Sequence, residues 1–360
     1  MRPVRKIPIW FFFTFLFLYC IMDAKKQKGM YSMKLSFEQV KSAARGVARV
    51  EEIDGKINFF RFTAEQDDFY ARRDKDFHRK SHASSGVILE FDTDSRTLGL
   101  SVEISSGSSR RFTAHSIFAD GKRVGQLGSA LAPDQVRECY ESSFDLGDGT
   151  KRGKILFPWA ACSKLMALTL DDGASFTPVQ KEKTVILFGD SITQGYDAAI
   201  PENSYASQLV AALDANGINK AIGGEVFCPE LASLPDAVKP DLITVAYGTN
   251  DWSRFCRLPE DAAAFYRTLR ATYPNTPIVA LAPVWRADWQ DCPDHSNFRL
   301  VAEGIAKIAE EVENVHFIDC FGFIPEDTSL YSDAYLHPND EGFRYYAENL
   351  IQAILRLHLN

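Results

Sequence analysis

The feature that most constrains the fold is a series of short, continuous apolar runs in the second half of the chain. After the polar stretch Pro178–Lys183, these runs alternate with amphipathic segments whose apolar residues recur at helical spacing. Runs without polar alternation suit strands that are buried on both faces, as in a parallel sheet covered by helices. The sequence therefore predicts a doubly wound α/β domain over residues 184–360. Its candidate strands are Thr184–Phe188, Asn219–Ile222, Leu242–Tyr247, Pro277–Ala282 and Val315–Asp319.

Residues 33–178 have a different pattern. Apolar and polar residues alternate in short runs, separated by turn residues such as Asp120-Gly121. Alternation with a period of two and frequent turns are typical of an antiparallel β-sandwich, and we expect a jelly roll. No long helical pattern interrupts these runs. The basic stretch Arg72–His82 is interpreted as a solvated loop, because acidic residues are interleaved with it.

The N-terminal segment, residues 1–32, stands apart from both predicted domains. Basic residues precede the uncharged, mostly apolar run Ile7–Met22, which has the shape of a signal or anchor segment. This run is slightly short for a transmembrane helix and lacks a small-residue cleavage site after it. Two interpretations stay open. Either a helix at residues 7–22 attaches the protein to a membrane, or residues 1–32 are a non-native extension and a cytoplasmic protein starts at Met33.

Charge and motif content exclude several classes of function. The formal net charge of −8 repels phosphate backbones, so nucleic acid is not an expected partner. The seven cysteines are widely spaced and form no cluster of metal-ligand spacing, and the GxGxxG, P-loop and HExxH motifs are absent. No metal and no organic cofactor is therefore expected. Six histidines are interpreted as structural or solvated: His78, His82, His115, His295, His316 and His358.

Residues suited to acyl transfer follow the predicted strands. Ser191 comes directly after the first strand, Gly223-Gly224 follows the second, Asn250 follows the third, and Asp333 and His337 follow the fifth. Ligands of doubly wound sheets bind beyond the carboxyl ends of the strands, so these residues should converge. Together they offer a hydroxyl that can attack, an imidazole that can take its proton, and N–H donors for an oxyanion.

Four sequence blocks together resemble those of the SGNH (GDSL-type) hydrolases. The blocks are Phe188-Gly189-Asp190-Ser191-Ile192, Asn219–Gly224, Gly248-Thr249-Asn250-Asp251, and Asp333 with His337-Pro338-Asn339. The resemblance implies a flavodoxin-like catalytic domain and a serine esterase that needs no cofactor. The preceding sandwich makes the whole arrangement resemble carbohydrate esterase family 2 and related fused SGNH enzymes.

The resemblance also implies a role for each residue. Ser191 would be the nucleophile, and His337 would be its general base, oriented by Asp333. The oxyanion hole would combine the N–H groups of Ser191 and Gly224 with the side-chain amide of Asn250. Asp333 precedes His337 by four residues, where the family has three. A Ser–His dyad, with a backbone carbonyl orienting His337, therefore stays open.

The function that this resemblance favours is hydrolysis of acyl esters, with acetyl groups on carbohydrate as the first expectation, through an acyl-serine intermediate. Two alternatives remain: a lipase or esterase of small acylated molecules, and a non-catalytic glycan-binding protein. An α/β-hydrolase is excluded, because its GxSxG motif needs glycine where Thr193 stands. Side chains in the loops after the third and fourth strands are candidates for substrate contact: Trp252, Arg254, Trp285 and Arg286.

Overall fold

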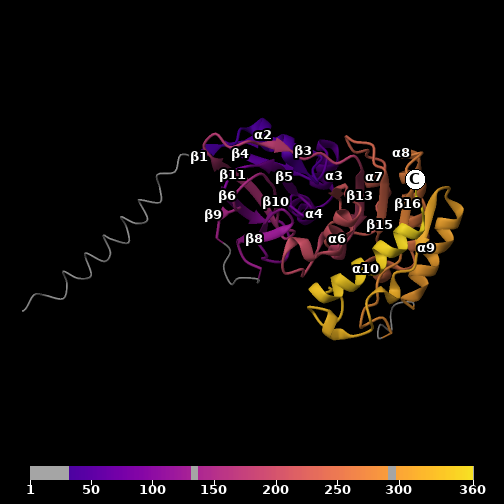
Figure 1. Cartoon of the computed structure of the whole chain (residues 1–360). Coiled ribbons are helices and arrows are strands. Elements are labelled where there is room, and N and C mark those ends of the chain that lie inside the picture. The colour runs from indigo at the N-terminus through magenta and orange to yellow at the C-terminus, as the bar shows by residue number, and fades with distance from the viewer. Residues whose placement is uncertain (1–31, 131–136, 291–296, 360) are drawn as a thin grey trace, which may run out of the picture.

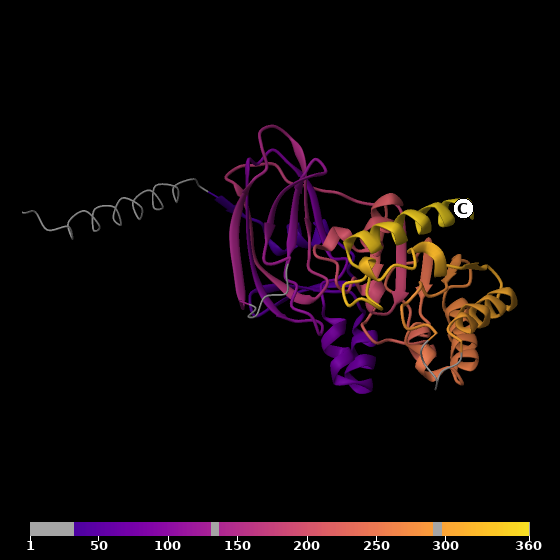
Figure 2. The same ribbon diagram turned by 90° about the horizontal axis from the view of Figure 1, so that it is seen from below.

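The computed structural model describes residues 32–130, 137–290 and 297–359 (Figure 1). The first half of the chain forms two antiparallel sheets, and the second half forms a parallel sheet flanked by helices (Figures 1 and 2). This architecture confirms the predicted fold class, a β-sandwich followed by a doubly wound α/β unit. The predicted membrane segment at residues 7–22 lies outside the described residues. Within the described ranges, no helix is both long enough and apolar enough to cross a membrane.

The sandwich core is built from alternate residues of both antiparallel sheets. Its strands are β1 (Ser32–Lys34), β2 (Ala44–Arg45), β3 (Arg49–Ile53), β4 (Lys56–Phe60), β5 (Ile88–Thr93), β6 (Thr97–Ser106), β7 (His115–Ala119), β8 (Lys122–Leu127), β9 (Cys139–Asp145), β10 (Lys151–Leu156), β11 (Ala161–Asp171) and β12 (Thr177–Pro178). One sheet has the order β3-β4-β11-β6-β9 with β1 beside β11, and the other has the order β12-β5-β10-β7-β8 with β2 beside β5. Leu100 of β6 packs in the same cluster as Leu89 of β5 and Ile155 of β10, so the two sheets share one apolar interior.

Two helices stand where the sequence analysis expected a solvated loop, and that interpretation was wrong. They are α3 (Ala64–Arg73) and α4 (Lys75–Ser81), which Figure 2 shows as a purple pair beside the sandwich. Thr63 and Gln66 form a capping box at the start of α3, a signal that the sequence carries openly. The helices were missed because their charged side chains lie on the outer faces and give the sequence a polar appearance, while Tyr70 is fully buried.

The parallel sheet has five strands in the order β14-β13-β15-β16-β17. These strands are β13 (Thr184–Gly189), β14 (Asn216–Asn219), β15 (Leu242–Ala246), β16 (Ile278–Leu281) and β17 (Val315–Ile318). In sequence order this is the flavodoxin-like arrangement 2-1-3-4-5, whose topological switch point lies between β13 and β15. A site is therefore expected at the carboxyl ends of these two strands.

The second strand of this sheet differs from the prediction, because β14 ends at Asn219 instead of beginning there. Its polar residues and Gly217 gave no apolar run to recognise. Gly217 is required at this position, since a Cβ atom there would lie 2.2 Å from a methyl carbon of Val210. The shift leaves residues 220–224 as a loop beyond the carboxyl end of β14.

Helices cover both faces of the parallel sheet. Val185 and Leu187 of β13 pack in the cluster that contains the side chains of α6 and α10, whereas Ile186 and Phe188 pack with those of α7, α8 and α9. This burial on both faces explains the continuous apolar runs in the sequence. The α-helices outside the α3–α4 pair are α2 (Phe37–Ala43), α5 (Ser191–Gln194), α6 (Tyr205–Ala212), α7 (Pro229–Ala232), α8 (Leu258–Thr272), α9 (Arg299–Glu311) and α10 (Asp340–Arg356). Short 3-10 helices are η2 (Pro201–Asn203), η3 (Asp251–Arg254), η4 (Phe321–Phe323) and η5 (Thr328–Leu330).

Arg61, which lies between β4 and α3, links the sandwich to the parallel sheet. Its side chain is fully buried, and its guanidinium donates hydrogen bonds to four backbone carbonyl groups. The acceptors are the oxygens of Ala83 at 2.6 Å, Lys80 at 3.1 Å, Ala221 at 3.0 Å, and Asn219. Burial lowers the pKa of Arg61 to about 9, so the group remains charged at neutral pH. One buried cation therefore fixes the end of α4 against the loop that follows β14.

We expect Arg61→Ala to lower the free energy of unfolding by roughly 3 kcal/mol or more, because each buried acceptor left unsatisfied costs about 1–3 kcal/mol. Urea denaturation followed by circular dichroism measures the change. Arg96→Ala is the matched control, since the exposed Arg96 side chain pairs with the exposed carboxylates of Asp145 and Asp148 and its loss should leave the urea midpoint unchanged. Equal midpoints for Arg61→Ala and the wild-type protein would contradict the assigned role.

Candidate active site

Ser191 is the first residue of α5, and Asp190 alone separates it from the end of β13. Asp190 caps this short helix, since its Oδ1 atom accepts the N–H of Ile192 at 2.9 Å. The sharp turn from strand to helix needs glycine at position 189, because a Cβ atom there would lie 2.1 Å from Thr193 Oγ1. The turn holds the Ser191 hydroxyl at the switch point of the sheet.

His337 joins Ser191 to Asp333 through two hydrogen bonds. Its Nε2 atom lies 2.9 Å from Ser191 Oγ, and its Nδ1 atom lies 2.7 Å from Asp333 Oδ2. The four-residue spacing between Asp333 and His337 is accommodated in the loop before α10, where Ser332 N–H donates to the His337 carbonyl at 2.8 Å. The structure thus brings together the three residues that the sequence analysis selected from two distant blocks.

The environment of Asp333 determines the direction of these hydrogen bonds. Its Oδ1 atom accepts the backbone N–H groups of Tyr335, Leu336 and His337 at 2.8–3.1 Å. Partial burial opposes ionisation, but the hydrogen bonds from the His337 side chain and from these N–H groups hold the pKa of Asp333 well below its usual range. An ionised carboxylate only accepts hydrogen bonds, so His337 Nδ1 carries a proton and Nε2 is left to accept from the Ser191 hydroxyl.

Three residues beside His337 were missed by the sequence analysis. The ring of Tyr196 stacks on the imidazole at a centroid distance of 5.5 Å, and Asp197 Oδ2 lies 3.9 Å from His337 Nδ1. Arg110, which comes from the sandwich, binds both carboxylate oxygens of Asp197 at 2.7 and 3.2 Å. No motif marks these residues. Tyr196 and Asp197 follow α5 in the same unit as His337, and the contact of Arg110 with Asp197 joins two folded units, which leaves no local pattern in the sequence.

A cleft of about 450 Å³ is lined by Gly224, Asn250 and Leu336, the residue before His337. Ser191 and His337 themselves are not among its lining residues. Gly224 adopts a positive φ of 91°, which glycine tolerates without strain. The N–H of Gly223 already donates to Gln194 Oε1 at 2.8 Å, which makes Gly224 the better candidate as a donor to a ligand. The side-chain amide of Asn250 donates a hydrogen bond to the Glu225 carbonyl at 2.9 Å, and this contact fixes the orientation of the amide group.

Three of the four predicted substrate-contact residues line the cleft, and the fourth does not. Trp252, Arg254 and Arg286 line the cleft. Trp285 is not among its lining residues: it is 6% exposed and packs edge-on against Tyr331 with a centroid distance of 5.3 Å. The expectation for Trp285 is therefore corrected, because its indole belongs to the core that surrounds α10.

The opposite wall of the cleft comes from the α3–α4 pair. Arg73 and Phe77 line it, and Arg73 forms a bidentate ion pair with the buried Glu225, with both N···O distances at 2.8 Å. Lys80 Nζ donates to the Gly223 carbonyl at 2.8 Å. The first half of the chain thus contributes directly to the candidate substrate site.

Part of the chain matches a known protein family. Residues 187–345 match the model of the GDSL-like Lipase/Acylhydrolase family. A search of curated proteins gives no match.

Solved structures cover nearly the whole described fold. A salicylyl-acyltransferase, SsfX3, from a tetracycline biosynthetic pathway is 24% identical with a TM-score of 0.78, over 92% of this chain and 98% of that one. A family two carbohydrate esterase from Cellvibrio japonicus is 18% identical with a TM-score of 0.63, over 91% and 98%. The acetyl xylan esterase Est2A from the rumen bacterium Butyrivibrio proteoclasticus is 17% identical with a TM-score of 0.60, over 90% and 97%. At these identities the likeness establishes the shared fold of sandwich and α/β unit.

Asp190 gives a prediction for the pH dependence of stability. Burial raises the pKa of Asp190 to about 7, against the opposing effects of the Ile192 N–H and of His337. Between about pH 4 and the folded pKa, the folded protein retains a proton that the unfolded chain has lost, so stability should fall as pH rises through this range. Asp190→Asn, which keeps the capping oxygen, should reduce this fall by an amount on the order of 3 kcal/mol.

Urea midpoints measured from pH 4.5 to 7.5 test this expectation, with the exposed Asp172→Asn as control. A slope that is the same in Asp190→Asn and in the wild-type protein would show that Asp190 ionises normally.

Proposed function

We propose that this protein is a carboxylic ester hydrolase, and we propose its mechanism and substrate class. The enzyme class follows from residues 187–345, which match the GDSL-like lipase/acylhydrolase family. The observation that carries the mechanism is the hydrogen-bonded series Asp333, His337 and Ser191 at the switch point of the sheet. Ser191 is the nucleophile, His337 is the general base and acid, and Asp333 orients the imidazole.

In the first step, Ser191 Oγ attacks the ester carbonyl carbon while His337 Nε2 takes the hydroxyl proton. The imidazolium that results is stabilised by the ionised Asp333, and it returns the proton to the departing alcohol as the acyl-serine forms. A water molecule then repeats the sequence, with His337 again as base, and releases the acid. The N–H groups of Ser191 and Gly224 and the amide of Asn250 donate to the oxyanion in both steps.

The substrate class that the cleft favours is a short acyl group, acetyl first, on a carbohydrate hydroxyl. Arg254, Arg286 and Ser253 give the cleft a polar lining suited to sugar hydroxyl groups, and the buried Trp252 supports the Arg286 guanidinium, which lies 4.9 Å from its ring centroid. A long apolar groove, which a lipase requires, is not formed by these side chains. The similar structures described as a family two carbohydrate esterase and an acetyl xylan esterase support this choice.

A second candidate is transfer of the acyl group to an alcohol acceptor instead of water. The similarity of the whole chain to a salicylyl-acyltransferase, at a TM-score of 0.78, favours it. Phe77 also provides an aromatic wall for the cleft, which would suit an aromatic acyl group. Both candidates use the same acyl-Ser191 intermediate and differ only in the nucleophile that removes the acyl group.

Ser191→Ala should reduce kcat/KM for p-nitrophenyl acetate by at least about 10³-fold, because the remaining donors stabilise the oxyanion but no nucleophile forms the acyl-enzyme. The wild-type protein should show an acetyl adduct on the peptide that contains Ser191 after rapid acid quenching and mass spectrometry. Ser175→Ala, on the surface of the sandwich, should behave as wild type. Persistent turnover in Ser191→Ala would overturn the mechanism.

Mass spectrometry of acetylated oligosaccharides, incubated with the wild-type protein or with Ser191→Ala, tests the substrate class. We expect loss of acetyl groups from the sugar only with the wild-type protein. Parallel reactions contain p-nitrophenyl octanoate, or p-nitrophenyl salicylate with an alcohol acceptor. A preference for octanoate would favour a lipase, an ester of the acceptor would identify a transferase, and glycan binding without turnover of any ester would identify a binding protein.

A further inference from the structure

Two histidines and one carboxylate meet at the junction of α3 and α4. Asp67 Oδ1 lies 2.8 Å from His82 Nε2 and 3.3 Å from His78 Nε2. The three potential ligand atoms all lie within 4.8 Å of one another. His78 and His82 are four residues apart, at the end of α4, which directs both imidazoles to the same side of the helix. Nothing in the proposed reaction uses these side chains.

The arrangement has the chemistry and the spacing of a transition-metal site. Ligand atoms at about 2.0–2.2 Å from a tetrahedral Zn²⁺ ion lie roughly 3.3–3.5 Å from each other. The distance between Asp67 Oδ1 and His78 Nε2 already has this value. His82 Nε2 lies closer to Asp67 Oδ1, at 2.8 Å, and within 4.8 Å of the His78 nitrogen, so the His82 ring has to shift for all three atoms to bind one ion. Two imidazoles and a carboxylate are ligands that zinc accepts, with water in the fourth position.

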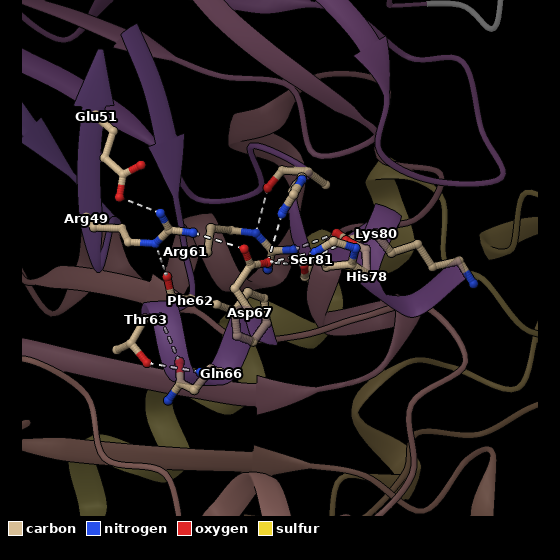
Figure 3. A network of polar contacts seen from close by, with 12 residues as sticks. Arg49, Glu51, Arg61, Phe62, Thr63, Gln66, Asp67, His78, Lys80 and Ser81 are labelled. Carbon is tan, nitrogen blue, oxygen red and sulfur yellow. Dashed lines mark hydrogen bonds and ion pairs between the residues drawn. The ribbon is translucent and has the colours of Figure 1, made fainter. Parts of the chain in front are cut away.

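A hydrogen bond on its far side orients the Asp67 carboxylate. Arg49 donates to Asp67 Oδ2 at 3.0 Å and is itself held by the Phe62 carbonyl and by Glu51. Figure 3 shows Arg49 and His78 on opposite sides of the Asp67 carboxylate. This contact orients Oδ1 toward the histidines, which is the usual function of a hydrogen bond behind a metal-binding carboxylate. The side chains of His78, His82 and Asp67 are 35%, 32% and 18% exposed, so an ion can enter from solvent.

We propose that Asp67, His78 and His82 form a binding site for a divalent transition-metal ion, with Zn²⁺ as the preferred ion, that clamps α4 to α3. This departs from the sequence expectation of no metal, because Asp67 lies outside any motif shared with the two histidines. The site is structural. It steadies α4, which supplies Phe77 to the cleft and Lys80 to the Gly223 carbonyl.

The test uses the full chain without an affinity tag, freed of metal by a chelator and titrated with Co²⁺, which reports tetrahedral coordination by visible absorption. We expect one equivalent to bind with these bands. His78→Ala and His82→Ala should each weaken binding by at least about tenfold, because removal of a ligand costs no less than removal of its hydrogen-bonded support. His358→Ala, an exposed histidine near the C-terminus, is the matched control.

Asp197, Asp333 and His337 also place ligand atoms within 4.8 Å of one another, so His337→Ala is titrated in parallel. Binding that is lost in His337→Ala but retained in both α4 variants would overturn the proposal, as would equal Co²⁺ binding by all proteins or no binding by the wild type. As a second measurement, Zn²⁺ should raise the thermal midpoint of the wild type and of His337→Ala, but not that of His78→Ala/His82→Ala. Circular dichroism verifies that the variants are folded.

Discussion

The structure depends on the requirement that a buried guanidinium be fully hydrogen-bonded. The guanidinium of Arg61 is fully hydrogen-bonded because four carbonyl groups surround it. Two belong to Lys80 and Ala83 in the first half of the chain, and two belong to Asn219 and Ala221 in the second. Because an unpaired buried charge costs several kcal/mol, neither the loop after β14 nor the end of α4 can take its position without the other. The positions of Gly224, in the loop after β14, and of Phe77, in α4, therefore depend on each other.

The class of the fold could be predicted because the burial of a strand determines the pattern of apolar residues in its sequence. Strands buried on both faces produced continuous apolar runs, and the half-buried strands of the sandwich produced alternation. The prediction was wrong where this trace is weak. β14 is short and contains Asn216 and Gly217, and the α3–α4 pair presents charged faces to solvent. In both places the signal lies in tertiary packing, such as the close approach of Gly217 to Val210, and not in the local pattern.

The residues of the candidate site that follow strand ends could be predicted from the sequence. Ser191, Asn250 and His337 each follow a strand, so the topology of the sheet was enough to bring them together. Residues contributed across the boundary between the two units could not be predicted in this way. Arg110 reaches Asp197, and Phe77 faces the cleft from α4. Trp285 shows the reverse error, since a place in the right loop did not prevent its indole from turning into the core.

The helical wall of the cleft has a consequence for which molecules the site accepts. Phe77 and Arg73 stand more than a hundred positions before Ser191 in the sequence, in the helical segment between sandwich strands β4 and β5. Changes in the length or composition of this segment would reshape one wall of the cleft, while Ser191, His337 and Asp333 would keep their places in the α/β unit. A change there would alter which molecules fit the cleft, and because Arg61 joins the end of α4 to the loop after β14, it would also be felt by the loop that carries Gly224.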